Sequence, residues 1–294
     1  MVDFICADKK KFAAFHTIYT DSNIFARYDW NERVEDAIDC TLDKNCLFIH
    51  EDKRMIGGFT LKDNNVSYPF MVPPYSNRKE FWGIVLSYAA QVSGQKEIIL
   101  HEIPEVDTQV LTRSYNATLR WSKRKMLRPT EAFSPILGNG FSFGDLTEKD
   151  ISEITQVIFD AHSAGHTSTV WEPNMTEIKN AVVRRFSLFG ETNTLHMSNV
   201  VVDEANQKIA GVCIAGIYPD SPYNFATIHQ VSVRPEYRRK GLAKAMMLKS
   251  INDAHAVSPV MTLGVLVGNP AEILYKEIGI ASGPSYSELS FTCI

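Results

Sequence analysis

A short run of basic residues that ends in a glycine is the segment of this chain with the clearest chemical potential. It follows an alternating stretch at 226–233, which predicts a β-strand, and precedes a helical pattern at 242–255. The first N–H groups of a helix lack partners within the helix, and the helix dipole adds partial positive charge there. Gly241 allows a tight turn and close approach of a ligand to the backbone. The run therefore predicts a cradle for a pyrophosphate. Its residues are Arg238, Arg239, Lys240, Gly241, Leu242 and Ala243.

The flanking segments resemble those of one enzyme family. The pattern Arg-x-x-Gly-x-Ala between a strand and a helix resembles the acetyl-CoA motif of the GNAT superfamily of N-acetyltransferases, and residues 229–235 resemble that family's central strand. Residues 268–279 resemble its next strand-to-helix segment. The basic run alone is also consistent with a solvated turn, but three motifs in the family's order, over roughly the C-terminal half, favour the resemblance. The glycines of a GxGxxG dinucleotide motif and of a P-loop are missing.

The resemblance implies how acetyl-CoA, the expected co-substrate, would bind. The pyrophosphate would lie on the amides of the cradle, and the backbone of Val231 and Val233 would pair with pantetheine as with a short strand. The side chains of these valines alone indicate only core positions. Asn269 would contact the co-substrate, although an asparagine before a proline is also an ordinary turn former.

The resemblance also implies a catalytic role for Tyr275, six residues after Asn269, with its hydroxyl near the thioester sulfur. It would protonate or hydrogen-bond the departing thiolate. By ordinary pKa values, near 10 for tyrosine and near 8.5 for a thiol, full transfer is uphill by about 2 kcal/mol. The alternative is a helix tyrosine whose ring lies in the core.

The general base is the least determined part of the expected site. His229 titrates near neutral pH and lies on the strand where relatives often carry Glu or Asp, although a histidine on a strand is often structural. Glu172 is a weaker candidate. His162 and His166 have helical metal spacing, but Gly165 interrupts it, so we expect a helix end and no metal.

Composition limits the class of protein. The chain has 294 residues, 22% charged, and a net charge of −4, so it is ordinary for a soluble protein and gives no sign of a nucleic-acid partner. No stretch suits a membrane span, and the N-terminus lacks the order of a signal peptide. Five scattered cysteines argue against a disulfide framework, so a reducing cytoplasm is expected.

The element pattern predicts an α/β protein of the α+β type, and the resemblance implies a mixed, mostly antiparallel sheet flanked by helices in each of two halves. Residues 47–58 parallel 200–212, residues 70–75 parallel 231–236, and 97–103 stand where 261–267 stand. We expect a degenerate GNAT-like domain at 1–130, a linker at 131–139, and an acetyl-CoA-binding domain at 140–294. Two unrelated halves with similar hairpins remain the alternative.

The first half departs from the second at the cradle. There the chain has residues 76–81, in which Glu80 would bring negative charge near a phosphate and Phe81 would block the backbone. We therefore expect only the second half to bind CoA. The resulting hypothesis is an N-acetyltransferase that moves acetyl from acetyl-CoA to a small-molecule or peptide amine by direct attack. The alternatives are a non-catalytic CoA- or metabolite-binding regulator and an inactive structural member of the family. The acceptor and the oligomeric state are not predicted.

Overall fold

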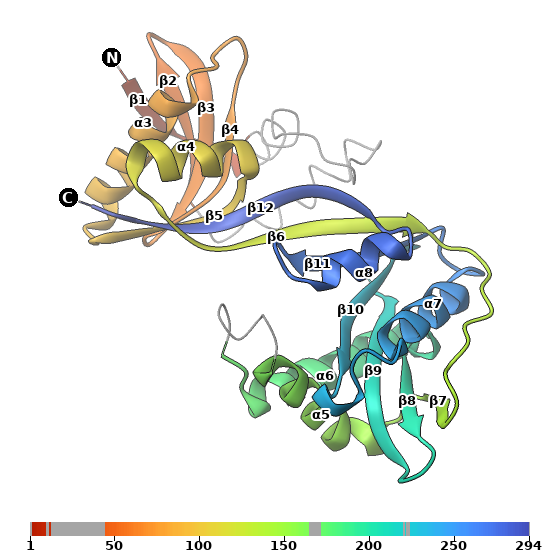
Figure 1. The fold of residues 1–294 in the computed structure, drawn as a ribbon. Coiled ribbons are helices and arrows are strands. Elements are labelled where there is room, and N and C mark those ends of the chain that lie inside the picture. The colour runs from red at the N-terminus through yellow and green to blue at the C-terminus, as the bar shows by residue number, and fades with distance from the viewer. Residues whose placement is uncertain are drawn as a thin grey trace. The chain divides into compact units, whose positions relative to one another are not determined.

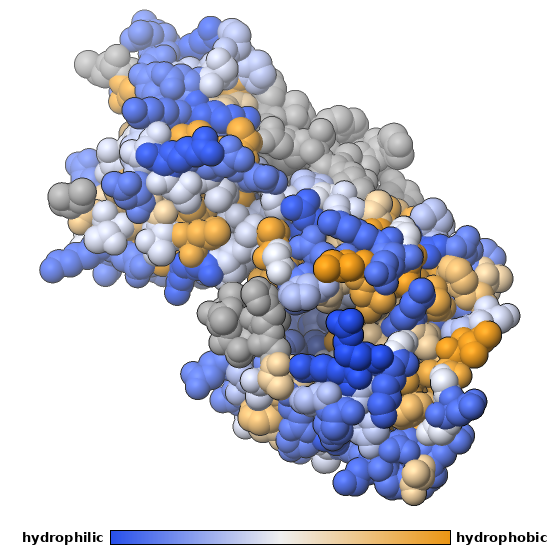
Figure 2. All heavy atoms as spheres, in the orientation of Figure 1, coloured by the Kyte–Doolittle hydropathy of each residue, from blue (hydrophilic) through white to orange (hydrophobic). Residues whose placement is uncertain are grey.

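The computed structural model describes residues 2–9, 12, 45–164, 172–219, 221 and 224–293. It divides into two compact units, Met1–Lys123 with Pro284–Ile294, and Arg124–Gly283. Among the described residues, no helix has the length and apolar character needed to cross a bilayer. On the face drawn in Figure 2, hydrophilic residues predominate and hydrophobic ones form small patches between them.

In its described residues, the first unit is a sheet with helices α3 (Arg78–Ser93) and α4 (Glu105–Tyr115) packed on one face (Figure 1). The strand order is β1-β2-β3-β4-β5-β12, with antiparallel neighbours except for the parallel pair β4 and β5. Its elements are β1 (Val2–Cys6), β2 (Asn45–Glu51), β3 (Arg54–Lys62), β4 (Asn65–Met71), α3 (Arg78–Ser93), β5 (Glu97–Pro104), α4 (Glu105–Tyr115), the start of β6 (Thr118–Pro129) and most of β12 (Ala281–Thr292). The helices α3 and α4 cover a core that contains Phe59, Trp82 and Leu100.

The second unit repeats this plan and is covered on both faces. Its strand order is β11-β10-β9-β8-β7, and only β10 and β11 are parallel. Its elements are the end of β6, β7 (Phe141–Asp145), α5 (Ile151–Ser163), α6 (Met175–Glu191), β8 (Asn199–Asp203), β9 (Lys208–Ile217), β10 (Ala226–Val233), α7 (Leu242–Ala254), β11 (Val260–Leu266) and α8 (Ala271–Glu277).

Alternation along β9 explains why the second unit needs helices on both faces. Cys213 and Ala215 belong to the core under α7 and α8, whereas Val212 and Ile214 belong to the core under α5 and α6 (Figure 1). Successive side chains of a strand point to opposite faces, so a strand that is apolar throughout must be covered twice. This central position makes β9 a rigid support for its neighbour β10.

The chain crosses between the units twice. β6 carries it from the first unit into the second, and β12 carries it back, pairing antiparallel with β5 from Tyr286↔Pro104 to Thr292↔Glu97. Glu288 lies at an irregularity of this pairing and accepts contacts from His101 Nδ1 (2.9 Å) and Arg120 (3.4 Å). The expected domains 1–130 and 140–294 differ from this division, because Pro284–Ile294 joins the first unit and the expected linker 131–139 lies inside the second.

The predicted fold class is confirmed, and so are most of the predicted elements. The helix expected at 242–255 is α7, and the expected strand-to-helix segment at 268–279 contains α8. Helix α5 ends at Ser163 as expected from Gly165, while His166 lies outside the described residues. In both units an antiparallel meander ends in a strand that pairs in parallel with the next strand along the chain, and a helix connects these two parallel strands. This shared order supports an internal repeat.

Candidate active site

The candidate site lies along one edge of β10, where that strand separates from β11. The two strands pair in parallel only at Ala226↔Met261, Thr227↔Thr262 and Ile228↔Leu263, although β10 continues to Val233 and β11 to Leu266. Beyond Ile228 this edge of β10 therefore has no partner strand among the described residues. An unpaired edge inside a sheet can accept an extended ligand as an added strand.

The backbone groups that face this open edge are those of Val231 and Val233. The N–H of Arg234 donates to the Ala210 carbonyl at 3.0 Å, and Val233 lies opposite Gly211. Hydrogen-bonded and non-hydrogen-bonded residue pairs alternate along an antiparallel ladder. Val233, and two residues earlier Val231, therefore make no backbone hydrogen bonds to β9, and their N–H and C=O groups point toward the open edge. The Val233 carbonyl also lies 3.4 Å from Arg238 Nε. Both valines thus present backbone groups at the open edge.

His229 lies at the N-terminal end of the open edge of β10, in a β-bulge. The register with β9 passes from Ile228↔Ala215 to Gln230↔Ile214, which leaves His229 as the extra residue. A bulge leaves one residue outside the ladder and turns its backbone groups away from their usual direction. The exposed His229 side chain meets the hydroxyl of Tyr218, 3.2 Å from Nδ1.

The C-terminal end of the open edge leads into the predicted cradle. Helix α7 begins after Gly241, which has φ +77° and no side-chain cap, and Arg239 also has positive φ, +65°. Alternating left- and right-handed residues turn successive N–H groups into one concavity that suits an anion. A Cβ placed on Gly241 would meet no protein atom within 4 Å, so the space beside it is open to a ligand. A left-handed arginine is strained, and strained residues of this kind concentrate at binding sites.

The basic side chains of the loop are not equivalent. Arg238 donates to the Ala161 (2.8 Å) and Ala164 (3.0 Å) carbonyls and so caps the C-terminal end of α5. Lys240 lies over the rings of Phe141 and Tyr237, each 5.3 Å from Nζ. Arg239 is exposed. The cationic charge expected at the cradle is present, but Arg238 and Lys240 are also structural contacts.

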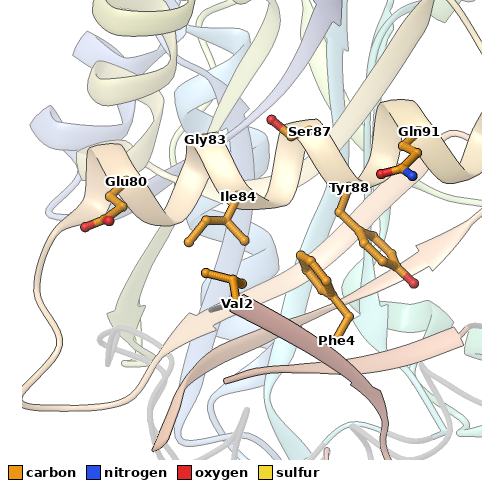
Figure 3. Close-up of a pocket in the computed structure, with 8 residues that line it drawn as sticks. All are labelled: Val2, Phe4, Glu80, Gly83, Ile84, Ser87, Tyr88 and Gln91. Atoms are coloured by element: carbon orange, nitrogen blue, oxygen red, sulfur yellow. The ribbon is translucent and has the colours of Figure 1, made fainter. Parts of the chain in front are cut away.

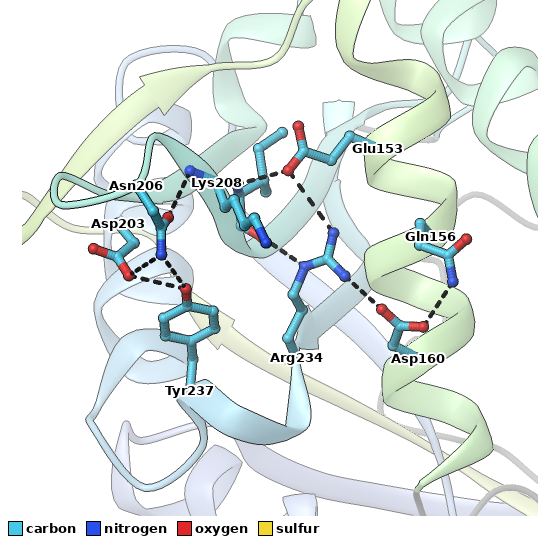
Figure 4. A network of polar contacts seen from close by, with 9 residues as sticks. Glu153, Gln156, Asp160, Asp203, Asn206, Lys208, Arg234 and Tyr237 are labelled. Carbon is cyan, nitrogen blue, oxygen red and sulfur yellow. Dashed lines mark hydrogen bonds and ion pairs between the residues drawn. The ribbon is translucent and has the colours of Figure 1, made fainter.

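A polar network holds the loop from both sides (Figure 4). Arg234 donates to the Ile209 carbonyl at 2.9 Å and pairs with Asp160 of α5. Tyr237 donates to Asp203 at 2.9 Å in the β8–β9 turn. The N–H of Ala205 and the Tyr237 hydroxyl hold the pKa of Asp203 below its usual value, so this carboxylate is charged at neutral pH. The cradle is thus fixed before any ligand arrives.

Tyr275 projects from α8 into the core below β9 and β10. The residue is 7% exposed, and burial, with the nearby Cys213 thiol, raises its pKa to about 12. Cys213 lies directly opposite Val231 in the β9–β10 register. The hydroxyl therefore lies close to the strand pair that carries the open edge, and it remains protonated at any physiological pH.

Asn269 starts the turn that leads into α8. Its side-chain oxygen accepts from the Ala271 N–H at 2.9 Å, and its own N–H donates to the Leu266 carbonyl at 3.0 Å. The turn-forming role is therefore present. The side-chain amide nitrogen makes no hydrogen bond to the residues that the structure describes, and it remains a donor for a ligand.

Sequence reasoning missed a second histidine near β10. His162, in the last turn of α5, lies 3.1 Å from Gln230 Nε2, which also donates to Ser232 at 2.7 Å. Burial lowers the pKa of His162, with partial opposition from the Gln230 contact. No sequence signal reports this approach of α5 to β10, because 68 residues separate the two side chains. Glu172, the weaker base candidate, is exposed.

The corresponding helix of the first unit is capped by its own side chains. Asn77 accepts from the Glu80 N–H at 3.2 Å and donates to the Glu80 carboxylate at 2.9 Å. Phe81 is 2% exposed and belongs to the core. Glu80 lies in the first turn of α3, beside a groove between α3 and β1 in which Phe4 stacks on Tyr88 (Figure 3). A helix start that holds its own carboxylate does not attract a phosphate.

Within the described ranges, no three His, Cys, Asp or Glu side chains are grouped as metal ligands would be. Cys6, Cys213 and Cys293 are free thiols, and Cys40 lies outside those ranges.

Comparison with known proteins gives the fold a family context. Residues 168–280, within the second unit, match the model of the acetyltransferase (GNAT) family. A search of curated protein sequences found no match. The family match covers the open edge, the cradle and Tyr275.

Solved structures resemble the whole chain. A GCN5-related N-acetyltransferase from Sphaerobacter thermophilus has a TM-score of 0.69 at 13% identity, covering 99% of this chain and 95% of the other. A GNAT-family acetyltransferase from Colwellia psychrerythraea has a TM-score of 0.60 at 12% identity over 100% of both chains. A tandem GNAT protein of the clavulanic acid biosynthesis pathway has a TM-score of 0.60 at 9% identity, covering 99% and 98%. At these identities the likeness establishes the fold.

Proposed function

We propose that this protein, which has the GNAT fold and matches the GNAT acetyltransferase family over residues 168–280, transfers an acetyl group from acetyl-CoA to an amine. One observation carries the proposal. The open edge of β10 leads from a bulge at His229 to an uncapped helix start at Gly241. A thioester with an extended arm and a pyrophosphate needs these features in this order.

Each part of acetyl-CoA has a place in this arrangement. The pyrophosphate would accept hydrogen bonds from the amides of the loop, with Arg239 contributing charge. The pantetheine amides would pair with the backbone of Val231 and Val233, and Asn269 would donate from its free amide nitrogen. The thioester would then lie near the bulge, where a backbone N–H released from the ladder can polarise its carbonyl.

Direct attack then requires changes in bonding at the thioester and the removal of protons from the amine. The amine nitrogen bonds to the thioester carbon, the C–S bond breaks as the tetrahedral intermediate collapses, and CoA leaves as a thiolate. An amine with a pKa of about 10.4 must lose one proton before attack, which costs roughly 4.6 kcal/mol at pH 7, and its nitrogen loses a second proton as the amide forms. His229 is proposed as the group that accepts the first of these protons, directly or through a water, and the second passes to the solvent. Tyr275 is proposed as the hydrogen-bond donor to the thiolate.

The role of His229 is testable against the neighbouring histidine. We expect His229→Gln to lower kcat/KM at pH 7 by about tenfold, because a water at this exposed position can replace only part of a general base. His162→Gln is the matched control and should change kcat/KM by less than about threefold. Steady-state kinetics with one active amine give kcat/KM for both variants. A larger loss in His162→Gln than in His229→Gln would assign the base to His162.

The function itself is tested with the purified protein, acetyl-CoA and a panel of amines. Release of free thiol that depends on the amine, with the acetylated amine identified by mass spectrometry, is the expected result. Calorimetry on the same sample should give one acetyl-CoA per chain. Saturable binding without thiol release for any amine would favour a non-catalytic CoA-binding protein, and absence of binding would exclude both.

A further inference from the structure

A cationic hollow lies beside the Tyr218–His229 contact of the second unit. Arg184, Arg185 and Leu188 of α6 line it together with Tyr218 and Pro219 at the end of β9, and its volume is ≈ 470 Å³. That volume falls in the range of small-ligand sites. The hollow is separate from the cradle, the open edge of β10 and Tyr275.

Arg185 is positioned for a ligand but lacks a counterion. Its guanidinium lies over the Tyr218 ring, 5.8 Å from the centroid, and its Nε is buried without a hydrogen-bond partner among the described residues. Neither Arg184 nor Arg185 forms an ion pair within the part of the chain that the structure describes. A buried donor left unsatisfied is costly, so an acceptor from a ligand would stabilise this arrangement.

Tyr218 connects this hollow to the bulge. Its ring packs edge-on against Phe189 with centroids 5.2 Å apart, which fixes its direction, and its hydroxyl meets His229 Nδ1 at 3.2 Å. The cationic group thus lies over the face of the Tyr218 ring, and the proposed base meets the hydroxyl of the same side chain. A molecule that places an amine at His229 can place a second group at Arg185.

We propose that Arg185, assisted by Arg184, binds an oxyanion on the acceptor, so that the acceptor is an amine that also carries a carboxylate or a phosphate. The inference rests on the proposed function, since it assigns the acceptor side of the same site. A guanidinium presents a planar fork of donors that matches both anions. Two adjacent arginines also repel a second positive charge, so polyamines are disfavoured as acceptors.

The test compares matched acceptors in the wild-type protein and in Arg185→Gln. Glycine, β-alanine and phenylalanine are each paired with the corresponding carboxamide, and O-phosphoethanolamine is paired with ethanolamine. We expect wild type to prefer the anionic member of at least one pair by about tenfold or more in kcat/KM. Arg185→Gln should remove most of that preference through KM, while the neutral member changes by less than about twofold. The pair that responds distinguishes a carboxylate from a phosphate.

Arg113→Gln is the control, since Arg113 is an exposed arginine of α4 in the first unit and should leave every preference unchanged. Equal rates within every pair, unaffected by Arg185→Gln, would overturn the anion site while leaving acyl transfer intact. Calorimetry separates the remaining cases. If no amine is acylated, binding of an anionic amine that is lost in Arg185→Gln would refute the function and retain the site. No turnover and no such binding would refute both.

Discussion

Gly241→Val is expected to raise the dissociation constant for acetyl-CoA by about a hundredfold or more. The side chain would fill the open space beside Gly241 and keep the pyrophosphate from the loop amides. Two lost charge-assisted hydrogen bonds, each about 1.5–3 kcal/mol, are enough for this effect. Titration calorimetry with acetyl-CoA gives the measurement.

The control for this variant is Gly140→Val. Gly140 also has a left-handed backbone, φ +84°, and a Cβ there also meets nothing within 4 Å, but it lies in the turn before β7. Both variants carry the same backbone strain, so a loss of affinity confined to Gly241→Val reports the cradle. Undiminished affinity in Gly241→Val would disprove the cradle. Two CoA molecules per wild-type chain would disprove the prediction that the first unit binds none.

Tyr275→Phe should reduce kcat by roughly tenfold to a thousandfold, with the affinity for acetyl-CoA unchanged. The ring remains to fill the core, and only the hydroxyl is lost. Its charge partner, the thiolate, develops mainly in the transition state, so turnover is affected more than binding. Steady-state kinetics and calorimetry on the same preparation separate the two quantities.

The raised pKa of Tyr275 sharpens this prediction. With a pKa of about 12, full proton transfer to a thiolate with a pKa of about 8.5 is uphill by about 5 kcal/mol, so Tyr275 acts as a hydrogen-bond donor. The hydroxyl is protonated below that pKa, and kcat should therefore show no loss from this group as pH rises to 10. Tyr286→Phe, at a half-buried tyrosine of the first unit, is the control and should leave kcat unchanged. An unchanged kcat in Tyr275→Phe would leave the residue a core tyrosine.

Local signals predicted the elements of the second unit well. The helix at 271–277 and the left-handed glycine before α7 follow from capping and turn chemistry within a few residues. The domain expected at 140–294 also contained the residues of β12, most of which lie in the first unit. Alternating apolar residues predict a strand and say nothing of its partner, so the pairing with β5 could not be read from the sequence.

In the candidate site, too, the sequence predicted contiguous features, whereas contacts between distant segments could not be predicted from it. Residues of the cradle and of β10 are contiguous, and their pattern predicted where backbone groups would be open. The contacts of Arg238 with α5, of Gln230 with His162, and of Arg185 with Tyr218 join segments that are far apart in the chain. Only packing brings them together, and no spacing rule applies to them. Glu80 was expected to repel a phosphate, and the structure adds that its carboxylate accepts a hydrogen bond from Asn77, the residue whose side chain caps α3.

The return of the chain along β12 has a consequence for biosynthesis. The first unit leaves the ribosome first, yet its sheet includes Pro284–Thr292, where Ser285 donates to Glu105 at 2.8 Å and Leu289 is fully buried. Until those residues emerge, β5 presents a bare backbone edge and an uncovered apolar surface, the features that promote mispairing between nascent chains. The unit that is synthesised first is therefore completed last, because its sheet cannot be completed until the entire second unit has been synthesised.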